Sequence, residues 1–319
     1  MSSLRISDTK VTSLRIVHYE NSNFMGRLHG GDMLNFLVDT GMLSAMKVAN
    51  GLAVLASLDD VVFKKPVLLG DIIEVEAQVE YIGNTSMEVT MRAKKGSETL
   101  VEASGVYVKV DDLLRPSIIT ARLNPNEEEK LIYEKALERR KNRAERIKDR
   151  LNKRYDVSDP TEGLRYRITT TIYVTPEMTY DGKIISAGKL LKVMDDLGGS
   201  LALRYIGYEG YKENSSTVVT VSANSMSFYT PVRLGDILEI RAGITYVGNT
   251  SIETVINVIR IDPKSQVKEH VTTAYFNYVR VDYNGKPTKV QPYTPQTEKE
   301  KKAYEDALIR RRKLLSLSW

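Results

Sequence analysis

Asn23, Gly30 and Gly31 are residues whose types and spacing could act on a carbonyl group. The two glycines come immediately before a long apolar stretch, residues 32–48, which is predicted to form a buried helix. Glycine lets a ligand approach the backbone closely, and N–H groups in the first turn of a helix have no intrahelical acceptor. Together with the helix dipole and the Asn23 amide, these donors could polarise a carbonyl oxygen or hold a water molecule. The alternative is a plain glycine turn with an asparagine cap.

A second apolar stretch, residues 189–206, carries two adjacent carboxylates, Asp195 and Asp196. Burial of an acid among leucine, valine and methionine raises its pKa, which makes it a better base. Because a buried carboxylate without a role is costly, Asp195 is the expected base. Asp196 lies about 100° away around the helix and is the fallback.

The chain also contains an internal repeat. Residues 83–86 match residues 248–251, and residues 66–72 match residues 231–237, both at a separation of 165 residues. Each copy is followed by a charged segment that contains a similar Tyr-Glu-x-Ala-Leu sequence and paired arginines. The sequence therefore predicts bodies at 1–124 and 157–292, a charged linker helix at 125–156, and a C-terminal charged helix at 293–319. A solvated linker without helical structure is the equal alternative for 125–156.

Within each body, apolar and polar residues alternate with a period of two, which predicts strands. Gly-Asn pairs between two of them favour tight hairpin turns. The expected strands cover residues 73–81, 87–93, 100–110, 238–247, 252–261 and 271–281. One strand, a buried helix and then an antiparallel meander predict an α+β fold in which a sheet wraps around a central helix, the hotdog fold. An ordinary α+β sandwich is the alternative.

Composition excludes several kinds of chemistry. The chain has no cysteine, so a disulfide framework, a cysteine nucleophile and a thiolate metal site are excluded. It has three histidines, none in the predicted buried helices, and His29 in the glycine turn is expected to be structural. No metal-ligand spacing, Walker loop or dinucleotide fingerprint is found, so neither a metal nor a resident cofactor is expected.

Charge and hydropathy indicate which kinds of partner and which cellular compartment to expect. Lys plus Arg is 46 against 41 Asp plus Glu, a formal charge of +5 that suits an anionic small ligand better than nucleic acid. The N-terminus has no apolar core, and no apolar run approaches the roughly 20 residues of a membrane helix. A soluble cytoplasmic protein that binds neither nucleic acid nor membrane is expected.

Residues 23–31 resemble the Asn-x-x-Gly-x-x-x-Gly-Gly signature of acyl-CoA thioesterases with the hotdog fold. Phe63-x-x-Pro66, Gly70-Asp71 and Gly83-x-Thr85-Ser86 also fit that family. The resemblance is to the tandem type, which includes brain acyl-CoA hydrolases, and it covers nearly the whole chain.

The resemblance implies a hydrolase of lipid metabolism that converts acyl-CoA to free acid and CoA. Residues 191–199 resemble the family segment with the catalytic aspartate, and Asp195 falls on the matching position. Family members form the site between paired hotdogs, which implies one composite site with Asn23, Gly30 and Gly31 facing Asp195. Whether Asp195 acts as general base or as nucleophile stays open.

The two units are not equivalent. Val38 occupies the place of Asp195, and Asp39 that of Asp196. Thr179 is assigned to the place of Asn23, and Ala187-Gly188 to that of the glycine pair. The mirror site, Thr179 with Asp39, is therefore expected to be impaired.

CoA is expected as part of the substrate and not as a bound cofactor. The hairpin turns could contact it, with a purely structural turn as the equal alternative: Asn84, Thr85, Ser86, Asn249, Thr250 and Ser251. Since single-domain relatives form hexamers of hotdogs, a tandem chain is expected to form a homotrimer. The alternatives for function are a non-catalytic acyl-CoA sensor or carrier on the same fold, and a nucleic-acid or protein scaffold that uses the Arg-rich helices.

Overall fold

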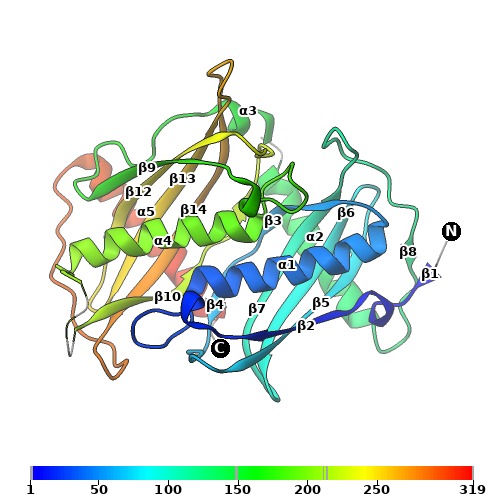
Figure 1. The fold of residues 1–319 in the computed structure, drawn as a ribbon, viewed down its shortest axis with the longest axis horizontal. Helices are drawn as coiled ribbons and strands as arrows, with labels where there is room; N and C mark the ends of the chain where they lie inside the picture. Colours follow the sequence, from blue (N-terminus) through cyan, green and yellow to red (C-terminus); the bar gives the residue numbers. More distant parts are fainter. Residues whose placement is uncertain (1–2, 148–149, 211, 213–214, 318–319) are drawn as a thin grey trace.

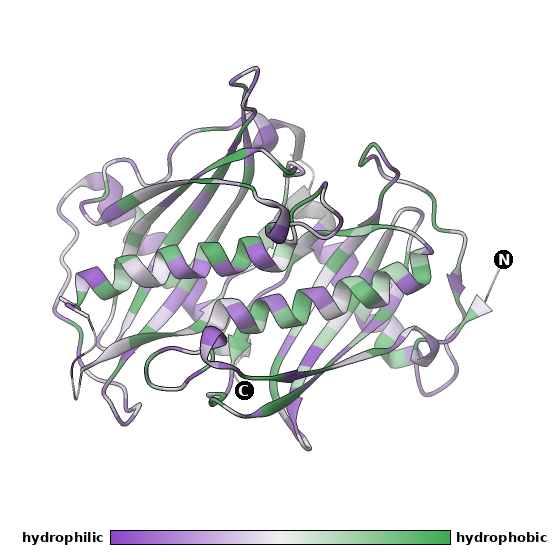
Figure 2. Ribbon diagram, viewed as in Figure 1, coloured by the Kyte–Doolittle hydropathy of each residue, from purple (hydrophilic) through white to green (hydrophobic). Residues whose placement is uncertain are grey.

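The structure is a computed structural model that describes residues 3–147, 150–210, 212 and 215–317. Two long helices lie side by side at its centre, α1 (Gly30–Ala49) and α4 (Ala187–Tyr205), with strands curving behind both (Figure 1). Most of α1 and much of α4 are buried, as their apolar composition predicted. Figure 2 shows hydrophobic residues along both helices and the strands behind them, and hydrophilic residues in many of the turns.

Within the described residues, twelve strands form one antiparallel sheet. The first unit contributes β2 (Val11–Ile16), β3 (Ala53–Leu58), β4 (Val61–Phe63), β5 (Ile72–Ile82), β6 (Ser86–Lys95) and β7 (Glu98–Lys109). The second contributes β9 (Arg167–Tyr173), β10 (Thr217–Ala223), β11 (Met226–Ser227), β12 (Ile237–Val247), β13 (Ser251–Ile261) and β14 (Lys268–Val281). Each half of the sheet wraps around its own helix, so the predicted tandem hotdog fold is confirmed.

The two half-sheets join edge to edge at the centre of the molecule. β4 pairs with β10, and β3 pairs with β11. Asp60 strengthens the junction, because its Oδ1 accepts from the N–H of Ser225 at 2.6 Å. An unpaired strand edge is open to association with other chains, and the fusion closes this edge internally.

Charged helices follow each half-sheet. α2 (Lys130–Ile147) and α3 (Arg150–Tyr155) occupy much of the predicted linker, of which residues 148–149 lie outside the described part. In α2, the buried Arg143 is held by Asp59 and Glu88 of the first unit. In α5 (Glu298–Leu317), Arg310 Nη2 contacts Glu253 Oε1 of the second unit at 2.7 Å. Helices with few apolar residues are thus held to the sheet by ion pairs.

Ser3–Leu4 (β1) and Arg122–Leu123 (β8) form a separate short ladder. Among the helices of the described residues, none combines the length and apolarity that a membrane span requires.

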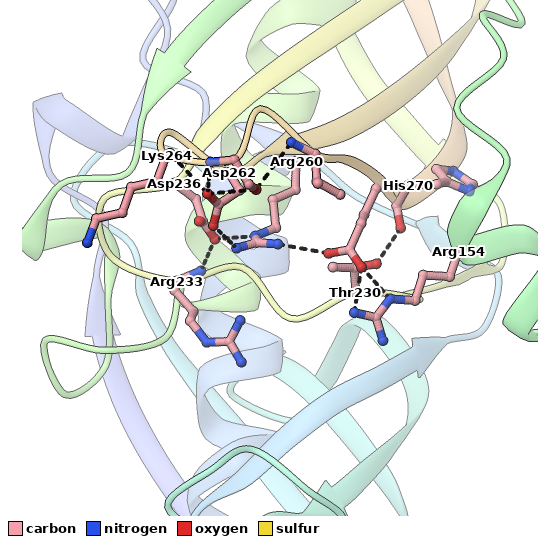
Figure 3. Close-up of polar contacts among 11 residues, drawn as sticks. Arg154, Thr230, Arg233, Asp236, Arg260, Asp262, Lys264 and His270 are labelled. Carbon is pink, nitrogen blue, oxygen red and sulfur yellow. Dashed lines mark hydrogen bonds and ion pairs between the residues drawn. The ribbon is translucent and has the colours of Figure 1, made fainter.

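A buried charge network fixes the Gly-Asp motif of the second unit (Figure 3). Asp236 Oδ2 accepts from the N–H of Arg233 at 2.7 Å and from Nε of Arg260 at 2.6 Å. Arg260 Nη1 contacts Glu269 Oε2 at 2.8 Å, and Arg154 of α3 donates to the other oxygen of Glu269. The network connects α3, β13 and β14 with the turn before β12, so the Gly-Asp motif has a structural role in the second unit.

Candidate active site

The N-terminus of α1 meets the middle of α4. The N–H of Gly31 donates to Asp195 Oδ2 at 2.7 Å. A Cβ on Gly31 would lie only 2.8 Å from the backbone Cα of Lys192, so glycine is needed for this approach. The same crossing is held by an ion pair between Lys192 Nζ and Asp32 Oδ1 at 2.9 Å. The structure therefore brings together Gly31 of the first unit and Asp195 of the second.

The predicted role of Gly31 needs one correction. Its N–H was expected to polarise a substrate carbonyl, but this donor is already occupied by Asp195. Gly30, the first residue of α1, lines the neighbouring cavity instead. Since the first N–H groups of a helix lack intrahelical acceptors, the N–H of Gly30 is the candidate backbone donor at this helix end.

Asp195 is buried, with 4% of its surface exposed, and it is surrounded by donors. The hydroxyl of Thr220 lies 2.9 Å from Oδ1 and 3.1 Å from Oδ2. Burial, with a contribution from the charge of Asp196, raises the pKa of Asp195, and the bonds from Thr220 and Gly31 oppose the rise, so that the pKa is about 7. A carboxyl group with a pKa near neutrality can accept and return a proton under physiological conditions.

Thr220, on β10, is a site residue that the sequence analysis missed. It pairs with Tyr278 as Leu55 pairs with Tyr107 in the first unit. A Cβ on Gly30 would lie 2.5 Å from Thr220 Cβ, so β10 packs directly against the start of α1. The second repeat has a threonine where the first has Leu55, and this difference is the signal that could have identified Thr220.

A cavity of about 330 Å³ lies beside these residues and is lined by both units, so we call it the composite cavity. Asn23 lines it with Gly30 and Thr220, and Asp195 lies behind Thr220. Asn23 Oδ1 accepts from the N–H groups of Met25 (3.0 Å) and Arg27 (3.1 Å), which leaves its Nδ2 as the group that can donate to a ligand.

Three cations line the same cavity and were not anticipated: Arg27, Lys64 and Lys65. Lys65 is paired with Glu98 and half exposed. His29 also lines the cavity, and it precedes α1 without a side-chain capping bond. The fallback acid Asp196 is exposed, in contrast to Asp195.

The mirror site lacks the corresponding acid. The hydroxyl of Tyr107 donates to the carbonyl of Val38 at 2.7 Å, as Tyr278 donates to the carbonyl of Asp195 at 3.0 Å. Val38 and Asp195 are thus equivalent, as predicted, and Asp39 matches Asp196. Burial raises the pKa of Asp39, whose Oδ1 lies 3.4 Å from Ser186 Oγ.

The assignment of Thr179 to the place of Asn23 is wrong by one residue. The bridges between Ser22 and Leu28 and between Thr179 and Ile185 are equivalent, so Thr179 matches Ser22 and Tyr180 matches Asn23. The error arose because the two turns are closed by different side chains. In the second, Asp181 Oδ1 accepts from the N–H of Lys183 (2.9 Å), so residue types did not reveal the register.

The hairpin turns proposed for CoA have structural bonds of their own. The carbonyl of Asn84 accepts from Ile119 N–H, and that of Asn249 accepts from Val290 N–H, both at 2.8 Å. None of the six candidate residues, all within the described part of the chain, lines the composite cavity. Thr85 and Ser86 instead line a second cavity on the mirror side.

A family model described as "Thioesterase superfamily" matches residues 25–102 and 182–266, half of the chain and one segment in each repeat. The chain therefore belongs to the thioesterase superfamily, and the predicted thioesterase identity is confirmed.

Individual proteins agree with this assignment. The chain is 25% identical over 323 residues to a mouse protein named cytosolic acyl coenzyme A thioester hydrolase, which covers 93% of this chain and 81% of that protein. It is 33% identical over 147 residues to protein VdlD of Helicobacter pylori, over 46% of this chain and 79% of that protein. The solved structure of an acyl-ACP thioesterase from Bacteroides thetaiotaomicron superposes with a TM-score of 0.54 at 13% identity, over 86% of this chain and 100% of that chain. At that identity the likeness is one of fold.

Proposed function

We propose that the chain hydrolyses acyl-CoA thioesters to free acid and CoA at one composite site between the two units. The contact that carries the proposal is the bond from Gly31 N–H to Asp195 Oδ2, since it joins a carbonyl-binding helix end in one repeat to an acid in the other. Relatives named cytosolic acyl coenzyme A thioester hydrolase, similar over nearly the whole chain, support the substrate class and a cytoplasmic location.

In the proposed reaction the thioester oxygen accepts from Gly30 N–H and Asn23 Nδ2. Donors fixed in a water-poor site stabilise the negative charge that develops on that oxygen. Ionised Asp195 takes a proton from water, the water oxygen bonds to the acyl carbon, and the C–S bond breaks. The proton then passes from Asp195 to the departing CoA sulfur. Direct attack by Asp195, followed by hydrolysis of an anhydride, is the other route open to this geometry.

The cations that line the composite cavity are suited to the CoA part of the substrate. Phosphate groups of CoA are anionic, and Arg27 and Lys64 on the cavity wall are candidates to pair with them. We propose no resident cofactor for this reaction, because CoA enters as part of the substrate.

We propose further that the chain assembles as a homotrimer. The duplication already provides one pair of hotdogs in each chain, and three such pairs would make a ring of six. Light scattering should then give three times the 36.0 kDa mass of one chain. A mass of one chain would contradict the assembly but leave the composite site unaffected.

The direct test of function is release of free thiol from acyl-CoAs of increasing chain length, compared between wild type and Asp195→Asn. Rapid release by wild type and strong loss in the variant are expected. Binding of acyl-CoA by the wild type with no release of thiol would instead indicate a carrier or sensor.

A further inference from the structure

A second cavity, of about 390 Å³, lies on the mirror side and shares no lining residue with the composite cavity. Val54 and Val108 contribute to its wall from the first unit, and Leu190 and Val232 from the second. Its size falls within the range of about 300–1,000 Å³ found for small-molecule pockets. The cavity therefore has room for a ligand that the proposed reaction does not use.

The residues around it lack the counterparts of Asp195, Thr220 and Asn23, the side chains proposed to act on a thioester. Val38 replaces the acid, and Leu55 stands in the register position of Thr220. Tyr180 takes the place of the asparagine, and its hydroxyl accepts from the N–H of Ala187 at 3.2 Å. This N–H corresponds to that of Gly30, so the donor for a substrate carbonyl is already occupied by the protein. A molecule bound here would be neither polarised nor attacked.

The wall of the second cavity is nevertheless well ordered by hydrogen bonds. Thr230 Oγ1 donates to the carbonyl of His270 at 2.9 Å, beside the charge network of the second unit (Figure 3). The N–H of Tyr229 donates to the carbonyl of Val271 at 2.8 Å, and that of Phe228 to Ala56 across the unit boundary at 2.9 Å. A wall fixed in this way is preformed, which lowers the entropic cost of binding.

The charge of the lining indicates the class of ligand. Among the described residues that line the second cavity, none is charged, and the polar side chains are all hydroxyls, such as Ser57 and Thr230. The composite cavity, in contrast, is lined by Arg27, Lys64 and Lys65. Phosphate-bearing CoA is thus suited to the composite cavity, while the second cavity is suited to a chain of methylene groups without a charged head.

We infer that the second cavity is a non-catalytic binding site for an uncharged lipid with one aliphatic chain. Removal of that chain from water against valine and leucine walls provides the driving force, and the hydroxyls can bond a neutral polar end.

The test uses 1-decanol as the probe and two matched valines. Val108 lines the second cavity beside its strand partner Val54, and Val279 lines the composite cavity beside its strand partner Val219. Val279→Trp should fill the composite cavity and abolish hydrolysis, yet calorimetry should still detect one saturable decanol site. Val108→Trp should remove that site and leave hydrolysis of acyl-CoA unchanged. The double variant should bind no decanol.

Thermal unfolding serves as the control that each variant folds. Smaller substitutions at the strand-partner positions, Val54→Phe and Val219→Phe, serve as second variants for the two cavities. Decanol should raise the Tm of Val279→Trp and Val219→Phe, because a ligand that binds only the folded state stabilises it. The inference is overturned if decanol binding persists in Val108→Trp and Val54→Phe but disappears in Val279→Trp and Val219→Phe, or if no protein binds decanol saturably. A lack of hydrolysis in every protein, with decanol binding as expected, would reject only the proposed reaction.

Discussion

The N–H of Gly31 and the carboxylate of Asp195 lie 2.7 Å apart although they belong to different repeats. The bond holds the acid behind Thr220, next to the cavity that Gly30 and Asn23 line. It also explains the glycine, since a Cβ there would press on the backbone of Lys192. The proposed site therefore combines parts of two diverged repeats that neither repeat contains alone.

Asp195→Asn is expected to make the protein more stable at alkaline pH. Burial raises the pKa of Asp195 from 3.8 to about 7 in the folded state. Between these values the folded protein holds a proton that the unfolded chain has released, so wild type loses stability as pH rises from about 4 to about 7. An uncharged amide avoids this loss. The Tm of the variant should exceed that of wild type at pH 8, and the gap should narrow below pH 4. A lower Tm than wild type at pH 8 would contradict the raised pKa.

Thr220→Val is expected to shift the pH dependence of kcat to higher pH. The Thr220 hydroxyl donates to both oxygens of Asp195 and lowers its pKa, so its removal should raise that pKa further. Because the ionised carboxylate is the active form, the rise of kcat with pH should move to the alkaline side. Thr220→Ser retains the hydroxyl and should keep the wild-type profile. Equal profiles for the valine and wild-type proteins would mean that Thr220 does not tune the acid.

The elements with a regular period could be predicted from the sequence, whereas contacts across the units could not. The strands and the buried helices follow from side-chain alternation and from the long apolar stretches at 32–48 and 189–206. Asp195 could be singled out because a carboxylate in an apolar helix is costly. Thr220 carries no such cost, since threonine is ordinary in a strand, and only its comparison with Leu55 of the first repeat could have singled it out.

Errors in the site arose where the two repeats differ in local geometry. Thr179 was predicted to be the counterpart of Asn23 in the second repeat. The prediction was wrong because the two turns are closed by different side chains, Asn23 in the first and Asp181 in the second. The occupied N–H of Gly31 depends on the helix crossing, which sequence spacing does not specify.

Asn23→Asp should lower kcat by about 10² to 10³, as expected for loss of one oxyanion donor. The new carboxylate can still accept from Met25 and Arg27, so the turn should survive and the Tm should stay close to that of wild type. Asn23→Ala removes both the donor and the turn bonds and should lower the Tm as well. Since Asn23 and Asp195 act on one substrate, the double variant should be little worse than the poorer single variant. Full activity in a folded Asn23→Asp protein would remove Asn23 from the mechanism.

Separated halves should be inactive, and their mixture should regain activity. A cut between α2 and α3 leaves Arg143 with Glu88 in the first half and Arg154 with Glu269 in the second. Each half exposes a strand edge and can pair with itself. The first half then has no acid at position 38, and the second has Tyr180 instead of an asparagine. Thiol release by either half alone would argue against a composite site.

The most direct measurement compares thiol release from an acyl-CoA by Asp195→Asn and by Asp39→Asn. Both carboxyl groups lie in the central helices and have a raised pKa, but Asp195 accepts from the backbone N–H of Gly31 in the other repeat, whereas Asp39 contacts the side chain of Ser186. Asp195→Asn should lower kcat by about 10² to 10⁴, the usual contribution of a general base. Asp39→Asn and Thr179→Ala should keep most of the activity, with circular dichroism confirming the fold of each. If folded Asp39→Asn lost turnover and Asp195→Asn kept it, or if both lost it equally, the single composite site would be contradicted.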